Sequence, residues 1–109
     1  MSKMIELERA VTMRNLYKEA KEAILAEGIS KDILPQAELF DKQHVLDLLN
    51  QNNCTGLRVY YSMDETQNFH LLLVGVDTEG EDIIDSNDPQ ILDEGIKCPP
   101  TCPVNSELG

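Results

Sequence analysis

Two cysteines near the end of the chain are the most conspicuous candidates for chemistry, in the segment Lys97–Pro103, which reads KCPPTCP. Cys98 and Cys102 could form a disulfide, or bind a metal together with Cys54. Proline fixes φ near −65° and pushes the residue before it toward extended geometry, which would separate the two Cα atoms by about 12 Å. A disulfide needs roughly 4.4–6.8 Å, so a bend at Thr101 or a cis proline would be required. We therefore expect a stiff strap with free thiols, with the disulfide and the metal site as alternatives.

The remaining thiol and the two imidazoles could in principle support nucleophilic catalysis. Cys54 could be a nucleophile with His44 or His70 as its base, but a dyad also needs a third group that orients the base. The sequence contains no P-loop, dinucleotide fingerprint, G-x-S-x-G or H-E-x-x-H motif. We expect Cys54 to be structural and His44 to be a side chain of a capping turn. No catalytic residue, metal or cofactor is predicted, which favours a protein that is not an enzyme.

The first half of the chain is predicted to supply helices. Apolar residues recur near the helical period from Met4 to Glu27, and Gly28 is suited to end that helix. A break into two shorter helices, with Thr12 as a cap, is the alternative. A further helix is predicted from about Lys42 to Gln51, because Asp41 before it is a good N-cap.

Two strands with alternating residues follow, Gly56–Met63 and Phe69–Val76, joined by a polar stretch of hairpin-loop length. We call the odd-numbered side of this hairpin face A and the even-numbered side face B. If Asp64–Asn68 form the whole loop, the register follows. The predicted pairs on face A are Met63 with Phe69, Tyr61 with Leu71 and Val59 with Leu73, and those on face B are Ser62 with His70, Tyr60 with Leu72 and Arg58 with Val74.

The second strand, Phe69–Val76, is apolar on both faces, which predicts a central strand that is covered above and below. Helices can cover face A, whereas only the C-terminal tail or a second copy of the protein remains for face B. The expected fold is therefore α+β, with N-terminal helices packed on one face of a small, mainly antiparallel sheet and an extended C-terminal tail. The candidate ligand or interface residues all lie on face B: Arg58, Tyr60, Ser62, His70, Leu72 and Val74.

Length and charge restrict the class of protein. A chain of 109 residues favours one domain, here a helical part (1–53), a sheet (56–85) and a loop with an extended tail (86–109). The formal net charge of −11 argues against binding nucleic acid or anionic membranes through basic groups. The N-terminal residues lack the apolar stretch of a signal peptide, and no apolar run approaches ~20 residues. An odd number of cysteines without an export signal favours the cytoplasm.

Three functions remain open from the sequence. The first is a non-catalytic cytoplasmic interaction or small binding module that forms a homodimer through face B. The second is a small-molecule-binding protein or enzyme with a pocket around Tyr60 and His70. The third is an acidic antagonist of a basic protein partner, such as an immunity protein or a nucleic-acid mimic, which requires carboxylates clustered on one face.

The second half of the chain, GLRVYYSMDETQNFHLLLVGVDTEGEDI followed by CPPTCP, resembles a group of small bacterial proteins. They share a G-[IL]-R-x-Y-Y strand, an apolar strand ending in V-G-V-D, a glycine turn and a C-P-P-x-C tail. The N-terminal helices match only loosely. The resemblance implies no activity, cofactor or catalytic residue.

Overall fold

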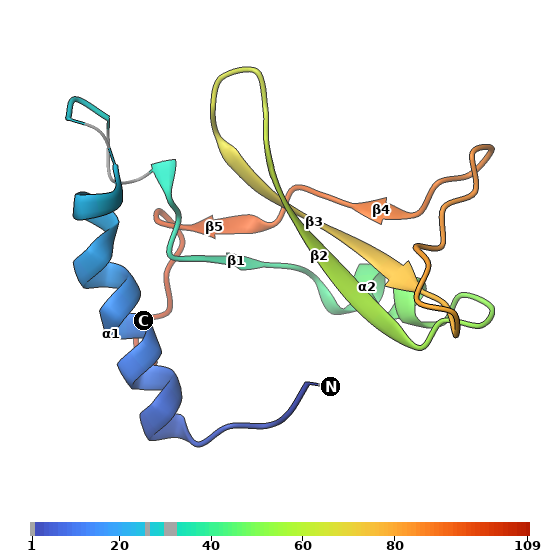
Figure 1. The fold of residues 1–109 in the computed structure, drawn as a ribbon, viewed down its shortest axis with the longest axis horizontal. Helices are drawn as coiled ribbons and strands as arrows, with labels where there is room; N and C mark the ends of the chain where they lie inside the picture. Colours follow the sequence, from blue (N-terminus) through green and yellow to red (C-terminus); the bar gives the residue numbers. More distant parts are fainter. Residues whose placement is uncertain (1, 26, 30–32) are drawn as a thin grey trace. The chain divides into compact units, whose positions relative to one another are not determined.

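The computed structural model describes residues 2–25, 27–29 and 33–109, and it has an α+β fold with antiparallel strands, as predicted (Figure 1). The chain divides into two compact units, Met1–Ala37 with Lys97–Gly109, and Glu38–Ile96. We refer to them as the helical unit and the sheet unit. No helix among the described residues is both long and apolar enough to cross a lipid bilayer. The expectation of one domain stays a prediction.

The helical unit is built on α1 (Leu7–Ile24), a single helix that is shorter than the predicted Met4–Glu27. It ends because Leu25 takes extended backbone angles, so the expected role of Gly28 as the residue that ends the helix is wrong; Gly28 lies further on, with φ +88°. The Tyr17 hydroxyl donates to the Pro35 carbonyl at 2.7 Å, which ties the connector after α1 back onto the helix.

The C-terminal tail also belongs to the helical unit, and it folds back where the sequence predicted an extended strap. Cys98 and Cys102 form a disulfide with a Cα–Cα distance of 4.7 Å, so the expected extended spacing is wrong. Both peptide bonds that precede Pro99 and Pro100 are cis, and the Thr101 N–H donates to the Lys97 carbonyl, which closes a turn. The disulfide was the alternative considered from the sequence.

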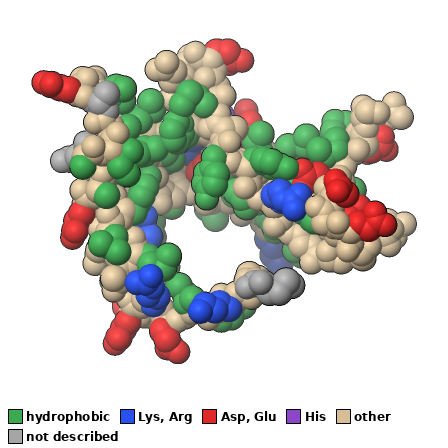
Figure 2. Space-filling model, in the orientation of Figure 1, with side chains coloured by type: hydrophobic (Ala, Val, Ile, Leu, Met, Phe, Trp, Pro, Cys, Tyr) green, Lys and Arg blue, Asp and Glu red, His purple; other side chains and the backbone are tan. Residues whose placement is uncertain are grey.

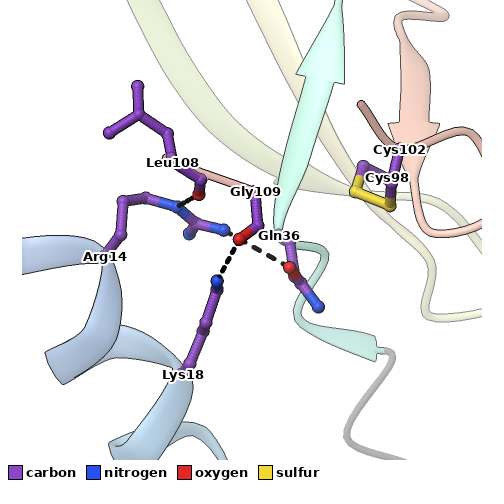
Figure 3. The surroundings of a disulfide bond; sticks show 7 residues. All are labelled: Arg14, Lys18, Gln36, Cys98, Cys102, Leu108 and Gly109. Atoms are coloured by element: carbon purple, nitrogen blue, oxygen red, sulfur yellow. Dashed lines mark hydrogen bonds between the residues drawn. A yellow bond between two sulfur atoms is a disulfide. The ribbon is translucent and has the colours of Figure 1, made fainter. Parts of the chain in front are cut away.

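Residues beyond the disulfide are held by side chains of α1. Figure 3 shows Arg14 and Lys18 pointing from the helix toward the last residues of the chain. Arg14 Nε donates to the Leu108 carbonyl at 2.9 Å, and Lys18 Nζ donates to the Gly109 carbonyl at 2.6 Å. The helical unit is therefore held together by polar contacts between α1 and segments distant in the sequence.

The sheet unit contains β2 (Gly56–Met63), β3 (Phe69–Val76) and β4 (Ile91–Leu92), in the order β2-β3-β4. The register of the β2–β3 hairpin is the predicted one at every position named above, and β3 is central as predicted. A second, two-stranded sheet joins β1 (Ala37–Leu39), which the sequence did not indicate, to β5 (Ile96–Cys98).

Helix α2 (Lys42–Leu49) covers one end of face A. Asp41 is its N-cap, as predicted, and its carboxylate accepts from the His44 N–H at 3.1 Å. Figure 1 shows α2 against the end of the hairpin that is remote from its loop. A Cβ on Gly75 would lie 3.2 Å from the Leu48 carbonyl oxygen and 3.1 Å from Cys54 Sγ. Glycine at this position therefore lets α2 approach β3 closely, and Leu48 and Leu73 are buried there.

Candidate functional site

Face B is bridged across β3 by side chains of β2. Arg58 Nη1 donates to Asp82 Oδ1 at 2.5 Å, and the Tyr60 hydroxyl donates to Asp82 Oδ2. Asp82 pairs with Val76 on the side of β3 away from β2, so both side chains must cross β3 to reach it. Val74 lies on β3 between the two ends of this bridge and is only 2% exposed within a single chain. Its burial therefore does not require a second copy on face B.

The bridge also shifts the pKa values of its members. The hydrogen bond from Tyr60, followed by that from Arg58, holds the pKa of Asp82 below its ordinary value. The same contact with Asp82 raises the pKa of Tyr60 above its ordinary value. Both oxygens of the Asp82 carboxylate thus accept hydrogen bonds within the chain, as expected of a structural bridge.

His70 lies in a different group from Tyr60. Its Nε2 is 2.9 Å from Asp64 Oδ2 and its Nδ1 is 2.8 Å from Asp93 Oδ1. A neutral imidazole carries one N–H, so both contacts are hydrogen bonds only when His70 is protonated. Ser62 Oγ donates to the His70 carbonyl oxygen at 2.8 Å, so Ser62 contacts the residue that it faces on β3.

The sequence analysis identified neither Asp93 nor Asp64 as a partner of His70, and Asp64 has further contacts. Its carboxylate accepts from Thr66 and from the Asn68 N–H at the start of the hairpin loop. These contacts, with His70 as a further donor, hold the pKa of Asp64 well below its ordinary value. An aspartate followed two residues later by threonine is a turn signal that would have indicated this loop contact.

The sheet unit has a cleft of about 590 Å³ whose lining includes neither Tyr60 nor His70, although its lining residue Asp93 contacts His70. The lining is Leu39, Phe40, Asp41, Lys42, His44, Leu92, Asp93, Glu94 and Ile96. At its rim His44 Nδ1 is 2.6 Å from Asp41 Oδ1, and this contact raises the pKa of His44. This cleft therefore does not coincide with the pocket that was expected around Tyr60 and His70.

Three backbone hydrogen bonds establish which groups of β3 point toward β2. The Thr55 N–H, immediately before β2, donates to the Val76 carbonyl at 2.8 Å. On the opposite side, the Leu71 N–H donates to Glu38 Oε2 at 3.1 Å and the Gly75 carbonyl accepts from the Ile83 N–H at 2.8 Å. Because these directions alternate along a strand, the even-numbered residues of β3 point toward β2.

The odd-numbered residues of β2 must then point their backbone groups away from β3, since directly opposite residues of an antiparallel pair share one orientation. They are Leu57, Val59, Tyr61 and Met63. In the part of the chain that the structure describes, β2 has a neighbouring strand on one side only. We call these four residues, with their outward N–H and carbonyl groups, the β2 edge.

The side chains of the β2 edge lie on face A and are exposed: Leu57 is 36% accessible, Val59 45%, Tyr61 90% and Met63 51%. The sequence analysis expected helices to cover face A. Within the sheet unit, the eight-residue α2 covers this face at the end near Gly75.

Each of the three cysteines is in contact with other groups of its own unit. Cys54 Sγ donates to the Gly56 carbonyl at 3.3 Å and lies against Gly75, which is a structural setting. Cys98 and Cys102 are bonded to each other. Among the described residues, no three histidine, cysteine or acidic side chains are grouped so that they could hold a metal ion.

Comparison of the chain with protein-family models, with curated proteins and with solved structures found no match.

Proposed function

We propose that this protein is a non-catalytic protein-interaction module and that the β2 edge is its binding element. The observation that carries the proposal is that four residues present outward backbone groups and exposed apolar side chains together. Addition of an extended strand to a sheet edge uses both features, since main-chain hydrogen bonds supply affinity and alternate side chains supply specificity.

The contrast with the other side of the sheet supports this assignment. On β3, the outward group of Leu71 is bonded to Glu38, Leu73 pairs with β4, and Gly75 accepts from Ile83. Proteins usually protect an edge strand with inward-pointing charges, proline or a bulge. The β2 strand has one charged residue, Arg58, whose side chain is engaged on face B by Asp82.

The predicted dimer interface on face B receives less support than the β2 edge. The polar groups of Arg58, Tyr60, Ser62 and His70 all have partners within the chain. Self-association stays part of the proposal, but through the β2 edge. Cytoplasmic location also stays part of it, although a disulfide such as Cys98–Cys102 is unusual in that compartment.

The cleft supports a second candidate function, binding of a small molecule. Its volume falls within the usual range for ligand sites, and Leu39, Phe40, Leu92 and Ile96 give it an apolar lining. A thermal-shift screen over a metabolite panel tests this candidate, with Phe40→Ala expected to remove any stabilisation.

The acidic-antagonist function is less well supported, because Figure 2 shows acidic side chains over both α1 and the segment after β3.

The proline variant Val59→Pro tests the β2 edge. Its outward N–H is outside the β2–β3 ladder, so proline removes an edge donor without breaking that ladder. Two assays are used: sedimentation of the protein alone, and fluorescence polarisation with ten-residue peptides that alternate apolar and polar residues. We expect binding in at least one assay to fall at least tenfold in Val59→Pro, while circular dichroism shows an intact fold.

The matched control is Val59→Thr, which keeps the N–H and the branched Cβ but removes apolar surface. It should retain binding within a few-fold. The proposal is wrong if the wild-type protein binds nothing in either assay, or if Val59→Pro binds as well as the wild type.

A further inference from the structure

We infer that the strand that pairs with the β2 edge is β2 of a second copy of this chain, antiparallel, with a two-fold axis at Tyr60. The inference rests on the proposed function, because it names the occupant of the same edge. It follows from the orientation of the backbone groups, from the side chains that pairing would bring together, and from the distribution of charge.

The orientation of the backbone restricts the register. Outward residues must face outward residues of the second copy, so odd-numbered positions pair with odd-numbered positions. With Tyr60 opposite Tyr60, Leu57 faces Met63 and Val59 faces Tyr61, and the symmetric pairs repeat these contacts. All four residues of each β2 edge then exchange hydrogen bonds. An axis at Val59 instead places Met63 opposite Thr55, which lies outside the strand.

This register also brings compatible side chains together. On face A, Val59 of one copy lies opposite Tyr61 of the other, an aromatic–β-branched pair that is favourable across antiparallel strands. On face B, Arg58 lies opposite Ser62 of the second copy, so no like charges face each other. The exposed apolar residues of the two edges would form one continuous surface across the axis.

The charge of β2 is compatible with pairing to a copy of itself. The chain carries a formal net charge of −11, so two copies repel each other over most of their surfaces. Strand β2 contains no aspartate or glutamate, and the guanidinium of Arg58 is paired with Asp82. Because added salt screens the repulsion between the rest of the two chains, dimerisation should strengthen with ionic strength.

The strength of the dimer can be bounded by its size. An interface of one strand and one row of side chains from each copy is at the small end of specific interfaces. We therefore expect an equilibrium between monomer and dimer that shifts with protein concentration in the micromolar range. Sedimentation velocity over a concentration series, at low and at high salt, measures both dependences.

A cysteine on the proposed axis tests the register. In a Cys54→Ser background, Tyr60→Cys would place two thiols in a non-hydrogen-bonded pair with Cα atoms about 4.5 Å apart, within disulfide range. The matched control is Ser62→Cys, whose two copies would lie about 13 Å apart along the strands. Under mild oxidation we expect a covalent dimer from Tyr60→Cys and none from Ser62→Cys, with the wild-type fold verified by circular dichroism.

The outcomes separate this inference from the proposed function. Three results together support it: self-association strengthens with salt, Val59→Pro abolishes self-association, and cross-linking occurs at position 60 only. Cross-linking at position 62 as efficient as at position 60, or self-association unaffected by Val59→Pro, overturns it. If the protein stays monomeric at its highest soluble concentration but binds peptides in a manner sensitive to Val59→Pro, the inference is wrong and the proposed function stands. If Tyr60→Cys does not fold, the wild-type and Val59→Pro sedimentation data decide.

Discussion

Arg58 Nη1 lies 2.5 Å from Asp82 Oδ1, and this contact joins the edge strand of the sheet to the turn segment beyond the central strand. The link runs over face B at the position of Val74, which is buried. The cover that the apolar pattern of β3 predicted is thus supplied at Val74 by the chain itself. On the other face, the apolar side chains of the β2 edge are exposed.

The Asp82 bridge leads to a first prediction about Tyr60. Asp82 raises the pKa of Tyr60 above its ordinary value of 10.0, chiefly by accepting its hydrogen bond. We expect Asp82→Asn to return the pKa of Tyr60 toward 10.0 and to lower the thermal midpoint. NMR titration of the tyrosine ring carbons measures the first effect. Asp85→Asn, on the exposed loop after the bridge, is the control and should change neither quantity.

The close approach of α2 to β3 leads to a second prediction. A Cβ at Gly75 would lie 2.8 Å from Gln51 Nε2 and 3.2 Å from the Leu48 carbonyl oxygen. We expect Gly75→Ala to reduce the free energy of unfolding by about 1–3 kcal/mol, the usual range for overpacking. Gly56→Ala is the control, because no atom lies within 4 Å of a Cβ built there. Urea denaturation of both variants measures the difference, and equal stabilities would contradict the packing described.

The contacts of Asp64 lead to a third prediction, on pH dependence. The pKa of Asp64 is lowered from 3.8, first by the Thr66 hydroxyl, then by the Asn68 N–H and His70. A carboxylate with a lowered folded-state pKa stabilises the protein above its unfolded-state pKa, and this contribution is lost as pH falls through the lowered value. Stability should therefore decrease on acidification below about pH 4.

Removal of the hydroxyl tests this assignment directly. In Thr66→Val, we expect the pKa of Asp64 to rise toward its ordinary value, as measured by NMR titration of the carboxyl carbon. Thr78→Val, in the turn after β3, is the control. An unchanged pKa of Asp64 in Thr66→Val would show that the hydroxyl does not stabilise the carboxylate.

The disulfide leads to a fourth prediction. Cys98 and Cys102 are separated by four positions, so their bond closes a short loop and restricts the unfolded chain only modestly. By the loop-entropy relation we expect reduction to lower the free energy of unfolding by about 2 kcal/mol. In unfolded, unreduced protein, iodoacetamide should label Cys54 alone, and after reduction it should label three cysteines. Labelling of all three without reduction would show that the strap with free thiols is the correct description.

The sequence by itself determined the local features of this protein. The alternation of residues in β2 and β3 and the length of the Asp64–Asn68 loop predicted the hairpin register, because side chains alternate with period two and the loop sets the phase. The Asp41 cap of α2 was predicted because capping depends on residues three positions apart. The central position of β3 followed from apolar residues on both of its faces.

Only the tertiary structure decided which groups close each face and which edge stays open. The reach of Arg58 to Asp82, the bond from Leu71 to Glu38 and the short span of α2 over face A all join residues distant in the sequence. No local pattern encodes such contacts, because they depend on where the chain returns after each turn. The Cys98–Cys102 disulfide likewise requires the backbone to bend between the two cysteines, whereas the prolines of the tail favour extended geometry.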